Sequence, residues 1–203
     1  MFKSETFTPI YNKSGYNSQN FIYTKGLHMI KKIILGLLTL IIIAAAALFF
    51  INGKDNYDAS KYEASATDAM NIGSKITFTL PDQFDKAQTL SPDTKKVIFV
   101  FAKSTGHTVK TFLKEQSKDY LVSKNTLFVA DISPMPTVIR NTFALPELKK
   151  SDFSVLLVYD KAIAKQFKND AEAEKIAIVS LDNGTVEAVK YISTADELKS
   201  ELN

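Results

Sequence analysis

Residues 97–102 read Val-Ile-Phe-Val-Phe-Ala, and this stretch decides the fold class. An extended chain with this sequence is apolar on both faces. That is typical of a strand covered on both sides in a mostly parallel sheet. Lys95 and Lys96 precede the stretch and Gly106 breaks the chain shortly after it. We therefore predict that residues 97–102 form the central strand of an α/β domain.

The segments that follow alternate between helical and extended patterns. Val109, Phe112 and Leu113 recur at helical spacing with Lys between them, which predicts a helix after Gly106. Apolar runs predict strands at residues 126–130, 155–159 and 176–181, and short helices near 138–146 and 163–167. This alternation predicts a three-layer α/β/α sandwich with a mixed central sheet.

The C-terminal part of the chain carries two local signals. Asp182-Asn183-Gly184 predicts a hairpin, because Asn-Gly supplies the positive φ angles of a type I′ turn, so residues 186–191 return antiparallel. Thr194 and Glu197 have the spacing of a capping box at the start of a final helix.

The chain before the central strand gives weaker signals. Ile76, Phe78 and Leu80 alternate with threonines and are stopped by Pro81, which predicts an edge or half-exposed strand. Residues 54–72 are polar with no sustained apolar face, so we predict a linker there and a domain over 73–203.

An uninterrupted apolar stretch runs from Ile33 to Ile51. It has just the length that a helix needs to cross a bilayer, and we predict a single membrane anchor within residues 29–53. Lys31 and Lys32 precede it while Asp55 follows it, so the positive-inside rule predicts a cytoplasmic N-terminus and an extracytoplasmic, periplasmic domain. The alternative is a signal peptide cleaved among the alanines at 44–47. Either way the domain leaves the cytoplasm.

Residues 1–28 are rich in Ser, Asn and Tyr and have no periodic apolar pattern. We predict a disordered cytoplasmic extension. Met29 begins a compact Met-Ile-Lys-Lys-Ile-Ile opening, so a second hypothesis is that translation starts there and that residues 1–28 are a mis-assigned extension.

Charge and cysteine content limit the partners of the domain and the sources of its stability. The net charge of the whole chain is +3, but residues 1–53 hold five Lys and one Glu, which leaves 20 basic against 21 acidic side chains beyond them. A nucleic-acid partner needs clustered basic side chains on the folded domain, so none is predicted. The chain has no Cys, so disulfides contribute nothing to its stability.

The exported domain resembles the thioredoxin-like fold. The opening Phe78-Thr-Leu-Pro-Asp-Gln-Phe84, followed by residues 97–102, is similar to the start of the peroxiredoxin-related branch, and the closing strand, turn, strand and helix also fit. Active relatives carry Cys-x-x-Cys at the start of the helix after the central strand, where the helix N-terminus activates the thiol. Here Thr105-Gly106-His107-Thr108 stands near that place, and Glu174 and Lys175 stand where the family has a cis-proline. The resemblance implies a degenerate member that is neither a thiol-disulfide oxidoreductase nor a cysteine peroxidase.

Candidate binding residues lie at Thr105 to Thr108. A helix N-terminus offers unpaired N–H groups that can hold an anion. The simpler interpretation is a helix capped by Ser104 or Thr105, with His107 facing solvent. His107 is the only His after residue 53, so no metal site or cofactor is predicted.

Asp131 and Pro136 are further candidates. Asp131 follows a buried strand at the sheet edge where α/β proteins gather function, although Pro134 and Pro136 close behind favour a turn. Phe84, Phe143 and Phe153 line either a groove or the core.

Three hypotheses for function remain. The preferred one is a binding or assembly module that docks an envelope protein. The others are an enzyme that uses His107 and Asp131 as an acid–base pair and a carrier of small ligands or anions.

Overall fold

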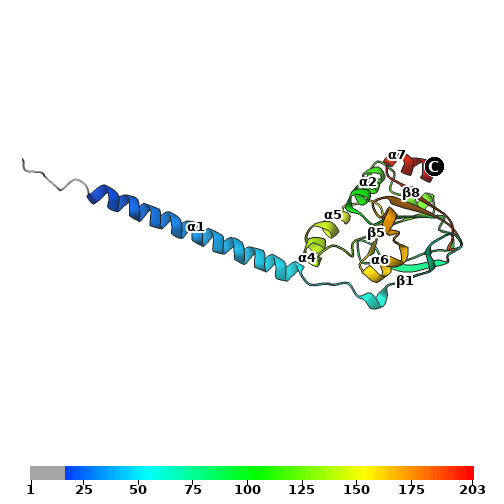
Figure 1. Ribbon diagram of the computed structural model, residues 1–203, viewed down its shortest axis with the longest axis horizontal. Coiled ribbons are helices and arrows are strands. Elements are labelled where there is room, and N and C mark those ends of the chain that lie inside the picture. The colour runs from blue at the N-terminus through cyan, green and yellow to red at the C-terminus, as the bar shows by residue number, and fades with distance from the viewer. Residues whose placement is uncertain (1–16) are drawn as a thin grey trace, which may run out of the picture. The chain divides into compact units, whose positions relative to one another are not determined.

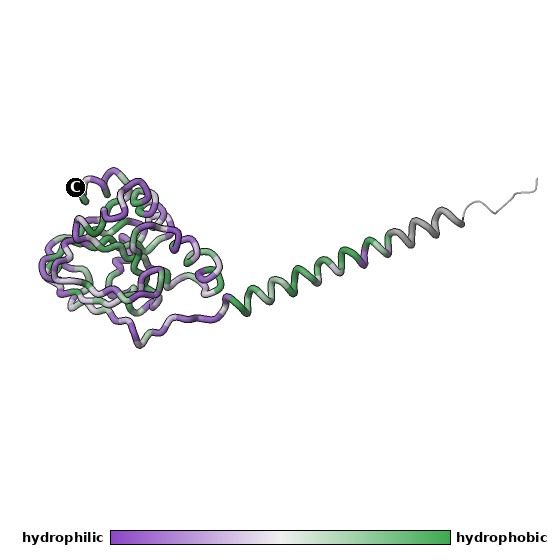
Figure 2. Tube along the Cα trace, turned by 180° about the vertical axis from the view of Figure 1, so that it is seen from behind, coloured by the Kyte–Doolittle hydropathy of each residue, from purple (hydrophilic) through white to green (hydrophobic). Residues whose placement is uncertain are grey.

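The computed structural model describes the backbone of residues 17–203 and the side chains from Leu27 onward. The chain forms two units, which meet between Ile51 and Asn52. In the first unit, α1 (Asn17–Asn52) includes a stretch from Leu27 that is apolar enough to cross a membrane, with a mean hydropathy of 3.0 (Figure 2). This helix is a single-pass membrane anchor or a signal sequence.

The start of α1 differs from the sequence-based expectation. The helix begins at Asn17, inside the stretch 1–28 that the sequence predicts to be disordered, whereas residues 1–16 lie outside the described residues. No proline occurs between Asn17 and Asn52, so no residue of this stretch lacks the N–H that a helix requires.

The second unit is built on a five-stranded mixed sheet of order β6-β5-β4-β7-β8. Strands β5 and β8 of this sheet are labelled in Figure 1. Its strands are β4 (Lys96–Val100), β5 (Thr126–Asp131), β6 (Leu156–Val158), β7 (Ile176–Asp182) and β8 (Thr185–Ile192). Strands β4, β5 and β6 run parallel, and β7 runs antiparallel to both β4 and β8. The apolar stretch at 97–102 therefore supplies the central strand, as predicted.

Both C-terminal signals are confirmed. Asn183 and Gly184 have φ angles of 47° and 74°, and they connect β7 to β8. Helix α7 (Ala195–Leu202) begins with the capping box, in which the Thr194 side chain accepts from the Glu197 N–H and the Glu197 carboxylate accepts from the Thr194 N–H.

Helices cover one face of the central sheet. They are α2 (Lys103–Lys114), α3 (Tyr120–Ser123), α7, and a helix that runs through α4 (Thr137–Ile139), η2 (Arg140–Ala144) and α5 (Leu145–Leu148). The η2 segment is a π-helical turn. Buried Ile98, Val109 and Leu198 belong to the core between these helices and the sheet.

The other face is covered by α6 (Lys161–Phe167) together with a small antiparallel sheet. The small sheet has the order β1-β2-β3, with β1 (Glu63–Met70), β2 (Ile76–Pro81) and β3 (Ala87–Thr89). Phe78, Phe99 and Phe167 pack ring against ring at the centre of this second core. The 3-10 turns η1 (Ala59–Lys61) and η3 (Asp170–Glu172) complete the fold.

This small sheet corrects two sequence-based expectations. Strand β1 occupies part of the stretch 54–72 that was expected to be a linker, and its pairing with β2 buries Met70. Strand β2 pairs on both sides, with β1 and β3, so it is not an edge strand. The whole unit is nevertheless the thioredoxin-like three-layer α/β/α sandwich that the sequence resembles.

Candidate functional site

Strands β4, β5 and β6 end at the same edge of the central sheet, which we call the carboxyl edge. In open α/β sheets ligands bind beyond this edge. The sequence-predicted residues Thr105 to Thr108 follow β4, and Asp131 closes β5. The topology therefore places the predicted candidates on neighbouring connections.

The first turn of α2 is not capped as the sequence predicts. The N-cap residue is Ala102, whose side chain makes no cap hydrogen bond, so neither Ser104 nor Thr105 serves as the cap. Thr105 is instead buried, and its hydroxyl donates to the Ala102 carbonyl at 2.9 Å. The helix begins earlier than expected because residues 103–105 already adopt helical geometry, with the Gly106 N–H bonded to the Ala102 carbonyl.

The other candidate residues of this turn do not form a binding site with one another. His107 is exposed, and the Thr108 hydroxyl donates to the Ser104 carbonyl at 3.2 Å. Gly106 lies close enough to the core that an added Cβ would meet Val100 at an ordinary contact distance of 3.7 Å.

Asp131 acts as a turn residue. Its carboxylate accepts from the Ser133 N–H at 2.9 Å, and it borders a cavity of about 290 Å³ whose other side is formed by residues of α6. Within the described chain no hydrogen bond or ion pair joins Asp131 to His107. Pro136 is exposed and precedes α4.

A second cavity, of about 240 Å³, lies at the carboxyl edge beyond β6, and it was not predicted from the sequence. Four parts of the domain wall this cavity: the segment after Asn52, the loop after β2, the helix 137–148, and the residue that follows β6. Its lining residues are Asp55, Asn56, Tyr57, Gln83, Asp85, Arg140, Asn141, Leu145, Lys149 and Tyr159.

Arg140 is the buried charge of this cavity, with a side chain only 5% exposed. Its Nη2 donates to Asp55 Oδ1 at 2.6 Å, and its guanidinium carbon lies 4.7 Å from the ring centroid of Tyr159. Its Nε is buried without a hydrogen-bond partner. Burial raises the pKa of Asp55, but hydrogen bonds from Arg140 and the Tyr57 N–H, with the charge of Arg140, outweigh this and hold the pKa below its ordinary value.

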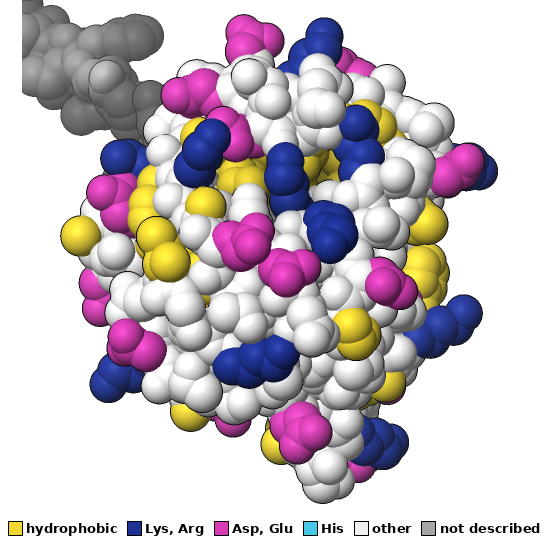
Figure 3. Space-filling model, turned by 90° about the vertical axis from the view of Figure 1, so that its right-hand side faces the viewer, with side chains coloured by type: hydrophobic (Ala, Val, Ile, Leu, Met, Phe, Trp, Pro, Cys, Tyr) yellow, Lys and Arg dark blue, Asp and Glu magenta, His cyan; other side chains and the backbone are white. Residues whose placement is uncertain are grey.

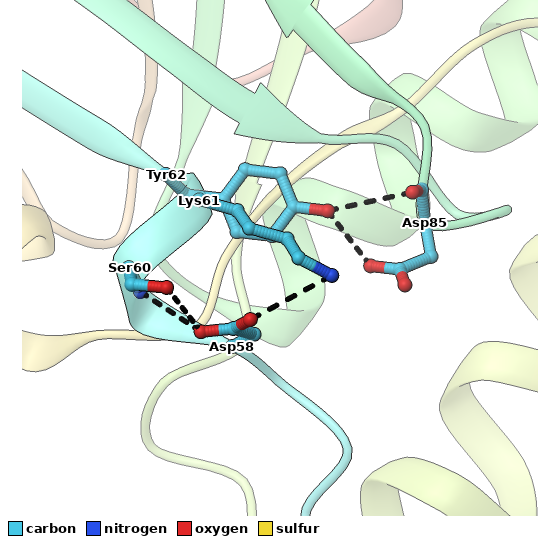
Figure 4. Close-up of polar contacts among 5 residues, drawn as sticks. All are labelled: Asp58, Ser60, Lys61, Tyr62 and Asp85. Carbon is cyan, nitrogen blue, oxygen red and sulfur yellow. Dashed lines mark hydrogen bonds and ion pairs between the residues drawn. The ribbon is translucent and has the colours of Figure 1, made fainter.

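Three tyrosines continue the packing from Arg140. Tyr57 stacks on Tyr159 with ring centroids 4.6 Å apart and on Tyr62 with centroids 5.6 Å apart. The Tyr62 hydroxyl donates to the Asp85 carboxylate at 2.9 Å, and Figure 4 shows this bond beside the turn of Asp58. Burial raises the pKa of Tyr159 to about 12. The pKa of Tyr62 is also raised to about 12, mainly by burial and secondly by the hydrogen bond to Asp85.

Large apolar side chains are exposed on the segments that wall the Arg140 cavity. Phe84 is 50% exposed between the lining residues Gln83 and Asp85, and Phe143 is 64% exposed on the helix that carries Arg140. Phe153, by contrast, is buried. The three phenylalanines thus divide between surface and core.

One sequence signal points to the Arg140 cavity. Arg140 is the only arginine in the chain, although 25 residues are Lys or Arg. A lone guanidinium among lysines indicates a position that needs a planar donor group rather than a mobile charge.

No family model matches the chain, and no curated protein matches it in sequence. Among solved structures, it is similar to StoA from Bacillus subtilis, with a TM-score of 0.45 and 15% identity over 63% of this chain and 96% of that one. It is also similar to peroxidoxin BcpB from Mycobacterium tuberculosis, with a TM-score of 0.42 and 19% identity over 62% and 88% of the two chains. A thioredoxin-like protein from Porphyromonas gingivalis gives a TM-score of 0.42 and 16% identity over 61% and 86%.

The strand order and the sequence define a thioredoxin-like domain without redox cysteines. In this chain it follows one apolar helix near the N-terminus.

Proposed function

We propose that the protein is a membrane-anchored binding module whose thioredoxin-like domain docks a protein of the cell envelope. With no cysteine in the chain, thiol-disulfide exchange and cysteine peroxidase chemistry have no nucleophile. On the face drawn in Figure 3, basic and acidic side chains are interspersed, which is typical of a soluble surface rather than of a nucleic-acid interface.

The proposed orientation rests on the charges that flank the apolar stretch of α1, residues 33–51. Lys31 and Lys32 precede the apolar stretch and Asp55 and Asp58 follow it, which favours a cytoplasmic N-terminus and an extracytoplasmic domain. Apolar residues 48–51 continue past the alanines of the alternative cleavage site, so retention as an anchor is favoured over cleavage.

The proposed docking surface consists of Phe84, Ile139 and Phe143. The exposure of these apolar side chains is the main observation that supports the docking function. These side chains are 50%, 46% and 64% exposed, and they come from two of the segments that wall the Arg140 cavity, the loop after β2 and the helix 137–148. Aromatic residues and arginine are enriched at the centres of protein interfaces, where truncating them costs the most binding energy. An apolar surface beside a buried guanidinium therefore suits a protein partner.

In-membrane photocrosslinking tests this function. A photoreactive residue at position 143 or 84 is expected to capture one recurrent envelope protein, identified by mass spectrometry. Val122 provides the control, because it is apolar and 75% exposed but lies before the opposite end of β5. Positions 107 and 136 report how far the contact extends along the carboxyl edge.

Two results would contradict the docking function. One is the absence of any recurrent protein adduct at positions 84 and 143, and the other is the same set of adducts at position 122.

The second candidate function, a carrier of small ligands or anions, is favoured by the Arg140 cavity itself. The acid–base enzyme gains no support, because no hydrogen bond or ion pair joins His107 to Asp131 within the described chain.

A further inference from the structure

The hydrogen bonds of Arg140 are incomplete. Only Nη2 has a hydrogen-bond partner, the carboxylate of Asp55, while Nε is buried and unpaired within the described chain. A buried donor that is left unpaired carries a desolvation penalty that no hydrogen bond offsets. The structure therefore retains a polar group that its own residues do not satisfy.

The guanidinium is held in place for a planar partner. The Tyr159 ring packs against it, with the guanidinium carbon 4.7 Å from the ring centroid, and this contact restricts the movement of the fork. Arginine binds a carboxylate through two parallel N–H groups, which gives both strength and orientation. Asp55 uses only one of these groups.

Asp55 itself is a replaceable partner. Its side chain is 50% exposed, and it belongs to the segment after Asn52, which also contacts the helix 137–148. Besides the ion pair, Asn141 Nδ2 donates to the carbonyls of Asn52 and Lys54 at 2.9 and 3.0 Å. The other carboxylate of the cavity, Asp85, is engaged by the Tyr62 hydroxyl, and Lys149 adds a second positive charge to the lining.

We propose that the Arg140 cavity binds a carboxylate group, which replaces Asp55 on the guanidinium and also engages Nε. Asp55 is thus an internal competitor, located in the segment that leads out of α1. A carboxylate that binds at Arg140 releases the Asp55 side chain, while the Asn141 hydrogen bonds and the stacking of Tyr57 on Tyr159 still hold the segment. The same chemistry is offered by a small free carboxylate and by the C-terminus or an acidic side chain of a peptide, so the inference does not require the partner to be a protein.

The test uses the full chain in detergent micelles, labelled with ¹⁵N only in arginine. Because Arg140 is the only arginine, the Nε–H group gives a single signal from this site. Sodium acetate is expected to shift this signal saturably, whereas sodium chloride at equal ionic strength is not. Asp55→Asn is expected to tighten acetate binding about tenfold, which corresponds to about 1.4 kcal/mol for the lost competitor. Asp58→Asn, outside the cavity, is expected to leave the affinity unchanged.

A pair of peptides distinguishes the two sources. If a short peptide with a free C-terminal carboxylate binds more tightly than acetate while its amide does not bind, the ligand group belongs to a protein. If acetate and benzoate bind as tightly as the acid peptide, the ligand is a small free carboxylate. The proposal is overturned if acetate shifts the Nε–H signal no more than chloride does, or if Asp55→Asn leaves the affinity for acetate unchanged. Because this assay needs no partner protein, its failure is distinct from failure of the crosslinking experiment.

Discussion

The Arg140 side chain places a buried positive charge at the carboxyl edge beyond β6. Arg140 is almost fully buried, which a charged residue tolerates only with a partner that offsets its desolvation. Asp55 provides the counter-charge, and the flat Tyr159 ring provides packing that a lysine ammonium would not match. The position therefore requires arginine for its shape as well as its charge.

Glu147 provides a pH-dependent prediction at the same scale. The pKa of Glu147 is lowered from 4.5 to about 2. The largest cause is the hydrogen bond from Lys110 at 2.9 Å, next comes the hydrogen bond from Lys150 at 3.1 Å, and the charges of both lysines add to these. The folded state therefore favours the carboxylate, so this contribution to stability is present above pH 4.5 and is lost as the pH falls toward 2. Carbon-13 NMR of the carboxyl group is expected to show titration near pH 2.

Replacing Glu147 tests the linkage directly. Glu147→Gln is expected to flatten the dependence of unfolding free energy on pH between 4.5 and 2, measured by urea denaturation. Glu187→Gln, on an exposed position of β8, is the matched control and is expected to leave this slope unchanged. An unchanged slope in Glu147→Gln would show that the lysine contacts do not persist in solution.

The helix 137–148 shows why the sequence could not locate the Arg140 cavity. Val138, Ile139 and Phe143 predict an apolar helix, yet Ile139 and Phe143 are exposed while Arg140 is buried. The π-helical turn at 140–144 shifts the helical phase, so the hydrophobic period no longer identifies the buried face. Ion pairing and ring stacking with residues distant in sequence then decide which side chain is inside.

The strands show the reverse situation. Residues 97–102, 126–130 and 176–181 could be assigned from the sequence, because long apolar runs identify buried strands irrespective of what covers them. Strand β1 was missed because its partly buried residues, Ala64 and Ala66, are too small to produce a hydrophobic alternation. Its existence depends on pairing with β2, which local sequence does not encode.

The turn between β7 and β8 gives a prediction for an element. Gly184 has a φ of 74°, and a Cβ added there would lie 3.2 Å from the Ile76 carbonyl oxygen. Gly73 has a φ of 86° but no atom within 4 Å of an added Cβ. An alanine at either position would be strained by the left-handed backbone, and only at position 184 would it also clash with another backbone atom. We therefore expect Gly184→Ala to lower the free energy of unfolding by about 2 kcal/mol and Gly73→Ala to lower it by about 1 kcal/mol.

Urea unfolding of the two variants measures the difference. A larger loss of unfolding free energy in Gly184→Ala than in Gly73→Ala supports the close approach of the turn to β2. Equal losses would mean that the turn moves away from β2 without cost and that only the backbone strain is felt.

For the whole molecule, the proposed orientation makes a testable prediction. Because Lys31 and Lys32 favour a cytoplasmic N-terminus, a C-terminal alkaline phosphatase fusion is expected to be active outside the cytoplasm. The full-length chain is expected to remain in the membrane after carbonate extraction. An inactive fusion would reverse the orientation, and release of a shortened soluble chain would identify a cleaved signal sequence.

The order of strands in the central sheet also imposes a sequence of events on biosynthesis. The chain is made from its N-terminus, but the second neighbour of β4 is β7, which lies close to the C-terminus. At ~5–20 residues per second, roughly 4–15 s pass between synthesis of β4 and of β7. During this interval one edge of the central strand has no partner, and unpaired strand edges promote aggregation. Nascent chains that end before residue 176 are therefore substrates for chaperones or proteases, and the domain closes only when its last hairpin arrives.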